Sequence, residues 1–185
     1  MPAPGQIRGM LLEEFLLQLL RSAGYKPVDE ADHETIVDGP SGLCVVGRGH
    51  RHQIDAIADY RLTHPFGHRQ RLCLEAKCFY DKAGIEVIRN AVGVLKDISE
   101  HWRGGGNVRY HYHYAVFCTG GFTDPAQEYA FAQDVFPIPL QNSAFIRPVI
   151  EAVRAVETRG WTRFAGESGF LAGVRRAIRR ALRAD

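Results

Sequence analysis

The chain has 185 residues, of which 45% are hydrophobic and 24% charged, a balance typical of one globular domain with a sizeable core. Its formal net charge of +2 is too small to indicate a nucleic-acid or membrane partner by itself. No apolar run reaches the ~18 residues of a membrane span. The four cysteines lack CxxC spacing, which argues against a zinc knuckle or disulfide frame and predicts buried thiols in a reducing cytoplasm.

The first half of the chain predicts one helix followed by several strands. Residues 6–23 have the apolar spacing of a helix, and Gly24 is suited to end it. Strand patterns follow at 34–38, 43–47, 53–62 and 71–79.

The second half alternates helices with strands. Helices are expected at 84–100, 124–133, 146–158 and 167–183, and strands at 110–119 and 135–140. Two prolines limit the last strand and favour a position at a sheet edge. This order predicts an α/β domain with a central mixed β-sheet flanked by helices.

The segment 72–79, LCLEAKCF, places two charges in an apolar strand. Alternation puts Glu75 and Lys77 on one face of that strand. Two half-buried charges cost several kcal/mol unless they are compensated. An ion pair, a wet sheet edge and a site that needs both groups are the three explanations.

Asp55 lies in the preceding strand pattern, on the face that also carries Gln53 and Asp59. If the strands pair as a hairpin, Asp55 and Glu75 become neighbours on one face. Adjacent carboxylates repel unless a cation separates them, and Mg²⁺ prefers such oxygen ligands. We therefore expect a metal site here, with Lys77 holding or activating the attacking water. Asp59, about 13 Å farther along the strand, is expected to have a surface or structural role.

The first helix offers a further carboxylate. On a helical wheel Glu14 falls with Gln18 and Arg21 on the expected wet side, whereas Glu13 falls within the apolar arc. A glutamate directed toward the core is the more informative one. We expect Glu13 to be an outer carboxylate of the site or a ligand of a second metal, the alternative being a surface glutamate.

Five segments then follow the pattern of a known family: GMLLEEFLLQLLRSAGY (9–25), QID ending at Asp55, EAK (75–77), IEVIRNAVGVLKDI (85–98) and AVFCTGGFTDPAQEYA (115–130). Together they resemble the PD-(D/E)xK nuclease superfamily, and in particular the Mrr-like restriction endonucleases. The resemblance implies a restriction-endonuclease-like core over 1–140. Residues 141–185 would be a helical extension packed on it, with a basic last helix.

The resemblance also implies an activity, namely Mg²⁺-dependent hydrolysis of DNA phosphodiester bonds, with Mn²⁺ able to substitute. In that scheme Asp55, Glu75 and the backbone carbonyl of Ala76 bind the metal, Lys77 positions the hydroxide, and Glu13 completes the catalytic set. A type II or type IV restriction enzyme of anti-phage defence is the expected role. A silent nucleic-acid-binding domain, an effector activated by oligomerisation or a partner, and a junction-resolving nuclease remain alternatives.

Candidate DNA contacts lie on both sides of this core. Gln53 and His52 precede the catalytic aspartate and could hold a phosphate. After Trp161 the chain has six arginines against two acidic residues, and Arg176 and Arg180 are suited to contact a DNA backbone. DNA and either a homodimer partner or a sensor protein are the expected partners, with no membrane association.

Overall fold

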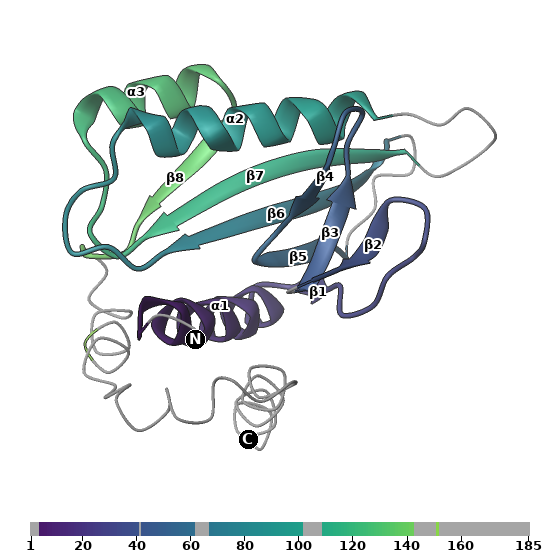
Figure 1. The fold of residues 1–185 in the computed structure, drawn as a ribbon, viewed down its shortest axis with the longest axis horizontal. Coiled ribbons are helices and arrows are strands. Elements are labelled where there is room, and N and C mark those ends of the chain that lie inside the picture. The colour runs from purple at the N-terminus through teal and green to yellow at the C-terminus, as the bar shows by residue number, and fades with distance from the viewer. Residues whose placement is uncertain (1–3, 41, 62–66, 102–108, 143–150, 152–185) are drawn as a thin grey trace.

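The computed structural model describes residues 4–40, 42–61, 67–101, 109–142 and 151 (Figure 1). Its helices are α1 (Pro4–Ser22), α2 (Ile85–Glu100) and α3 (Asp124–Ala132). Its strands are β1 (Tyr25–Pro27), β2 (Ile36–Gly39), β3 (Gly42–Val46), β4 (Arg51–Gln53), β5 (Ala56–Tyr60), β6 (Arg69–Lys77), β7 (Tyr110–Cys118) and β8 (Val135–Pro139).

Within the described residues, the central sheet has five strands in the order β1-β5-β6-β7-β8. β1, β5 and β6 pair in antiparallel fashion, whereas β6, β7 and β8 run parallel. The parallel connections are made by α2 and α3, as expected for strands that need a crossover. The expected α/β fold with a mixed central sheet is confirmed.

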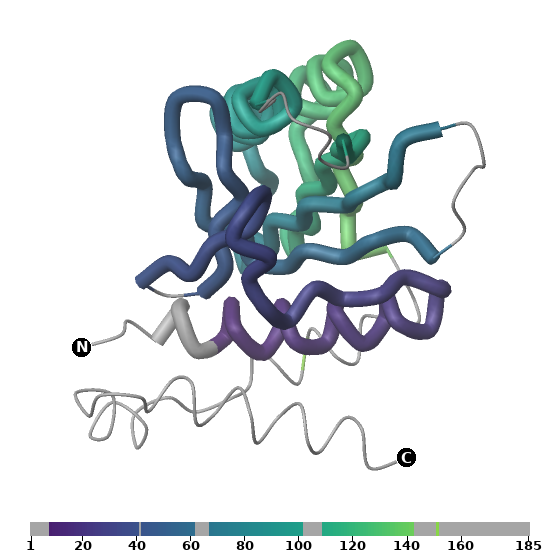
Figure 2. The backbone as a smooth tube through the Cα atoms, turned by 90° about the vertical axis from the view of Figure 1, so that its right-hand side faces the viewer, coloured from purple at the N-terminus to yellow at the C-terminus, as the bar shows by residue number. Residues whose placement is uncertain are grey.

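Helices cover both faces of this sheet, with α2 and α3 on one side and α1 on the other (Figures 1 and 2). Alternation along the strands divides the buried residues accordingly. Cys73 of β6 packs with Ile88 and Val92 of α2, and Leu74 of β6 packs with Leu16 and other leucines of α1. The two faces of β6 therefore look into two separate apolar cores.

The first helix ends where its sequence predicts. Gly24 has φ 89°, a left-handed conformation that favours glycine after a helix. Its N–H donates to the Arg21 carbonyl at 3.1 Å, closing the last turn. This turn directs the chain into β1, which pairs with β5 at the sheet edge.

Residues 53–62, expected to form one strand, are divided between two sheets. β4 ends at Gln53 and belongs to a three-stranded sheet of order β2-β3-β4, whereas β5 begins at Ala56 in the central sheet. The chain leaves the small sheet at Ile54 and Asp55, where the ladder is interrupted. Because the alternation of strand faces does not continue through this break, the expectation that Gln53 shares a strand face with Asp55 is wrong.

β8 forms an edge of the central sheet and contains two prolines, as its sequence predicts. The N–H of Leu140, just past β8, donates to the Cys118 carbonyl of β7 at 3.0 Å. Because N–H groups alternate in direction along a strand, positions 135, 137 and 139 point away from β7. Pro137 and Pro139 stand at two of these three outward positions.

None of the helices in the described part of the chain is long and apolar enough to cross a bilayer. The helices expected at 146–158 and 167–183, and with them most of the extension expected over 141–185, lie outside the described residues.

Candidate active site

The start of β5 and the end of β6 bring Asp55 and Glu75 together. Ala56 is paired with Leu74, so Asp55 and Glu75 are the next residues along the two antiparallel strands. Asp55 Oδ2 accepts a hydrogen bond of 2.8 Å from the N–H of Ala76. The aspartate expected from the sequence is therefore oriented by the backbone of the strand that carries the glutamate.

The carbonyl of Ala76 lies on the same side of β6. The neighbouring carbonyl, that of Lys77, points to β7, where it accepts the Thr119 N–H at 3.0 Å. Since carbonyl directions alternate along a strand, the Ala76 carbonyl points to the β5 side, toward Asp55. Two carboxylates and one backbone oxygen thus come from the residue just before β5 and from the adjacent end of β6.

Lys77 forms an ion pair with Glu75. Its Nζ lies 2.5 Å from Glu75 Oε1, and the two side chains are 30% and 13% exposed. Both lie on the β6 face shared with Cys73, as alternation predicts. The half-buried charges in this strand therefore compensate each other, while the lysine remains open to solvent.

Tyr114 is a further member of the site that the sequence did not single out. Its hydroxyl donates to Glu75 Oε2 at 3.3 Å from the neighbouring strand β7, and the residue is only 2% exposed. Burial, together with the negative charges of Glu75 and Asp55, raises the pKa of the Tyr114 phenol above its ordinary value. Tyr114 is thus a protonated hydrogen-bond donor near both carboxylates.

The helix glutamates differ from expectation in one respect. Glu13 is 9% exposed, as expected for an inward position, but Glu14 is only 2% exposed. The expectation that Glu14 lies on a wet face is wrong, because α1 is shielded over a wider arc than a helix with one buried stripe. Both glutamates belong to a helix on the sheet face opposite to that of Glu75 and Lys77.

The Glu13 side chain extends toward the start of its own helix. Its Oε1 is 4.0 Å from the position that a Cβ at Gly9 would occupy, so the side chain reaches back toward the first turns of α1. In those turns Arg8 Nη1 donates to Tyr80 Oη at 3.3 Å, three residues beyond Lys77. The start of α1 is thus linked to the loop that follows the candidate site.

The donor set fits a hard divalent cation, because carboxylate and carbonyl oxygens are the ligands that Mg²⁺ and Mn²⁺ prefer. Among the described residues, no group of three or more His, Cys, Asp or Glu side chains is arranged to hold a metal ion. The fit therefore rests on Asp55, Glu75 and the Ala76 carbonyl, without Glu13 as a direct ligand.

The candidate DNA contacts before Asp55 belong to the small sheet. His52 Nε2 lies 2.8 Å from Asp97 Oδ2 of α2, and the same carboxylate accepts the N–H groups of Gly49 and His50. These hydrogen bonds, that of His52 foremost, lower the pKa of Asp97. His52 thus anchors the β3–β4 turn to α2, whereas Gln53 is exposed on β4.

The basic residues expected to contact DNA near the C-terminus, Arg176 and Arg180, lie outside the described residues.

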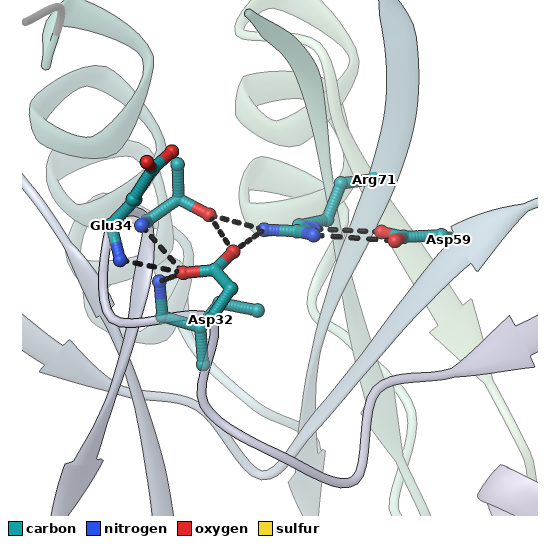
Figure 3. A network of polar contacts seen from close by, with 6 residues as sticks. Asp32, Glu34, Asp59 and Arg71 are labelled. Atoms are coloured by element: carbon teal, nitrogen blue, oxygen red, sulfur yellow. Dashed lines mark hydrogen bonds and ion pairs between the residues drawn. The ribbon is translucent and has the colours of Figure 1, made fainter. Parts of the chain in front are cut away.

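A second polar cluster surrounds Arg71 (Figure 3). Its Nε and Nη2 pair with the two oxygens of Asp59 at 2.7 and 3.2 Å, and its Nη1 donates to Thr35 Oγ1 at 2.7 Å. Asp32 lies 3.7 Å from Nη1 and accepts three backbone N–H groups of its own turn. Arg71 is 2% exposed. Its contacts with Asp32 and Thr35 join the loop before β2 to the central sheet. The Asp59 contacts agree with the structural role expected for it.

Comparison with known proteins adds a family and a fold. The model of the family Mrr_cat, described as restriction endonuclease, matches residues 6–146. The crystal structure of AF1548, a protein of unknown function, is similar with a TM-score of 0.51 at 13% identity, over 94% of this chain and 95% of that one. The DNA modification-dependent restriction endonuclease AspBHI gives a TM-score of 0.42 at 13% identity, over 98% of this chain and 41% of that longer chain. No curated protein matched the sequence.

Proposed function

Because the chain belongs to the Mrr_cat restriction endonuclease family, whose model matches residues 6–146, we propose that it is a metal-dependent endonuclease that hydrolyses DNA phosphodiester bonds. Membership supports a nuclease of the restriction-endonuclease type, with DNA as its substrate, and agrees with the resemblance found in the sequence. Beyond what family membership supports, we propose divalent-metal dependence, a type II or IV restriction activity and a role in anti-phage defence. The observation that carries them is the hydrogen bond between Asp55 and the Ala76 N–H, which holds one carboxylate beside the strand bearing Glu75 and Lys77.

Asp55, Glu75 and the carbonyl of Ala76 would hold Mg²⁺, or Mn²⁺ in its place. When bound, such an ion lowers the pKa of a coordinated water and offsets negative charge at the phosphate. This assignment is supported by the chemistry of the donors and by the pairing of Ala56 with Leu74, which sets Asp55, just before β5, beside Glu75 of β6.

The protein's own groups would position the attacking water and orient the two carboxylates. Lys77 would leave its ion pair with Glu75 to hold the attacking water and the scissile phosphate, a role suited to a compact ammonium on a partly exposed side chain. The Ala76 N–H would orient Asp55, and the Tyr114 hydroxyl would orient Glu75. Glu13 would act from α1 as an outer carboxylate.

A cleavage assay tests this function directly. We expect supercoiled plasmid, methylated or unmethylated, to be nicked or linearised in Mg²⁺ or Mn²⁺ and to stay intact in EDTA. Lys77→Ala should abolish cleavage, whereas Lys82→Ala, at an exposed position beyond the site, should not. Plasmid that the wild-type protein binds but leaves intact in both metals would instead favour the silent DNA-binding domain.

Partner dependence calls for a second measurement. A nuclease effector switched on by self-association would elute as a larger species with DNA than without it in size-exclusion chromatography, and its specific activity would rise with protein concentration. Activity that is independent of concentration would favour a nuclease that needs no such activation.

A further inference from the structure

Two large aromatic side chains are exposed directly after the candidate catalytic strand. Phe79 is 41% exposed and Tyr80 is 70% exposed, and they follow Lys77 by two and three residues. At ~3.3 Å per residue, Phe79 lies on the order of 7 Å along the chain from the lysine. Exposed aromatic area next to a reactive site indicates a surface that contacts a ligand.

Hydrogen bonds with the segment that follows β7 fix the backbone of the loop that carries these rings. Thr119 Oγ1 donates to the Phe79 carbonyl at 2.7 Å, and the N–H of Ala83 donates to the Gly121 carbonyl at 2.8 Å. A Cβ at Gly120 would collide with the Asp81 carbonyl and lie 3.1 Å from that of Phe79, so only glycine permits this close approach. The backbone is thus fixed at two residues that are 41% and 70% exposed.

The neighbouring charge favours a nucleic acid over an apolar protein partner. The guanidinium of Arg8 contacts the Tyr80 hydroxyl at 3.3 Å, and Lys77 is 30% exposed on the same end of β6. Cations near exposed aromatic rings are the combination that binds a phosphate backbone with its bases unstacked. In intact duplex DNA the base faces are covered by their neighbours, so a ring can stack only on an unpaired or displaced base.

We propose that Phe79 and Tyr80 form a stacking platform for an unstacked base of the DNA strand beside the scissile phosphate. The platform rests on the proposed nuclease function and adds a substrate class to it. Sites with an unpaired or easily displaced base next to the cleaved bond would be bound more tightly than fully paired duplex. Lys77 would then lie within about one nucleotide of the stacked base.

Binding without catalysis tests the platform. In EDTA, an oligonucleotide duplex with a mismatched 2-aminopurine should bind the wild-type protein with quenching of the base fluorescence, because the base stacks on a ring. Phe79→Ala and Tyr80→Ala should each weaken this binding about 10-fold and reduce the quenching, in line with the usual effect of removing one stacking partner. Binding of the fully paired duplex should change little.

Phe131→Ala is the matched control, because Phe131 is 69% exposed on α3, away from the end of β6. Its variant should bind and quench like wild type. Equal affinities of all three variants for the mismatched duplex, an equal loss on mismatched and paired duplexes, or no wild-type binding in EDTA would overturn the platform.

Different experimental results would disprove the platform and the nuclease function. Base-dependent binding without any cleavage in Mg²⁺ or Mn²⁺ would remove the nuclease function and keep the platform. Cleavage that is insensitive to Phe79→Ala and Tyr80→Ala, with unchanged quenching, would remove the platform and keep the nuclease.

Discussion

Asp55 accepts its hydrogen bond from the backbone N–H of Ala76, the residue that separates Glu75 from Lys77. A backbone N–H has no rotamers, so this hydrogen bond fixes the orientation of the Asp55 carboxylate relative to β6. The two acidic groups therefore keep their relation even where β4 and β5 separate at Ile54 and Asp55.

Asp55→Asn should lower plasmid cleavage by at least about 100-fold, because it keeps an oxygen acceptor for the Ala76 N–H but removes the negative charge. The fold should survive, which a thermal melt would verify. Asp38→Asn, at an exposed position on β2, is the matched control and should cleave like wild type. Wild-type rates for Asp55→Asn in Mg²⁺ would rule out its role as a metal ligand.

Tyr114→Phe should slow cleavage about 10-fold, since Glu75 loses a donor to one oxygen while retaining Lys77 on the other. The free energy of unfolding should fall by about 1 kcal/mol, the usual net contribution of one hydrogen bond. Urea denaturation and initial rates at varied Mg²⁺ would measure both effects. Tyr129→Phe, on α3, should change neither rate nor metal dependence, and an identical result for both variants would contradict the assignment.

Arg71→Met should destabilise the protein, because Asp59 and Asp32 lose their counter-charge while the arginine's volume is largely kept. Removing one partner of a buried pair costs about 3–5 kcal/mol, and the 30% and 37% exposure of these carboxylates places the effect at the low end. Urea denaturation would measure it. The double variant Arg71→Met with Asp59→Asn should recover part of the loss, whereas full additivity would mean that the pair does not interact.

The pKa of Asp97 is held below its ordinary value of 3.8 by the hydrogen bonds from His52 and the turn at Gly49 and His50. Its contribution to stability is therefore complete above pH ~3.8 and is lost as the pH falls through the lower, folded-state pKa. Asp97→Asn should be less stable than wild type at pH 6, and the difference should narrow at pH 3. Unfolding free energies at the two pH values test the sign; a difference that widens in acid would contradict it.

Local patterns were sufficient to predict most of the elements. The helix expected at 84–100 is α2 at Ile85–Glu100, and the strand expected at 71–79 is β6 at Arg69–Lys77. α2 shows the period of a helix with one buried face, and β6 alternates between two buried faces. The pairing of Asp55 with Glu75 followed from the same alternation once the two strands were assumed to be neighbours.

The features that the sequence did not predict depend on contacts between distant segments. Nothing within 53–62 marks the change of sheet, because its alternation continues across Ile54 and Asp55 even though the ladder does not. Tyr114 became recognisable only through the parallel register that pairs it with Cys73. Glu14 is buried because α1 is covered beyond the single stripe that a helical wheel assumes.

The prolines of β8 limit how copies of this molecule can associate. An incoming strand needs outward N–H donors, and at positions 137 and 139 the pyrrolidine rings supply none. Continuation of the sheet from one copy into another through this edge is therefore blocked. A two-fold assembly of the protein would have to use a surface other than the β8 edge.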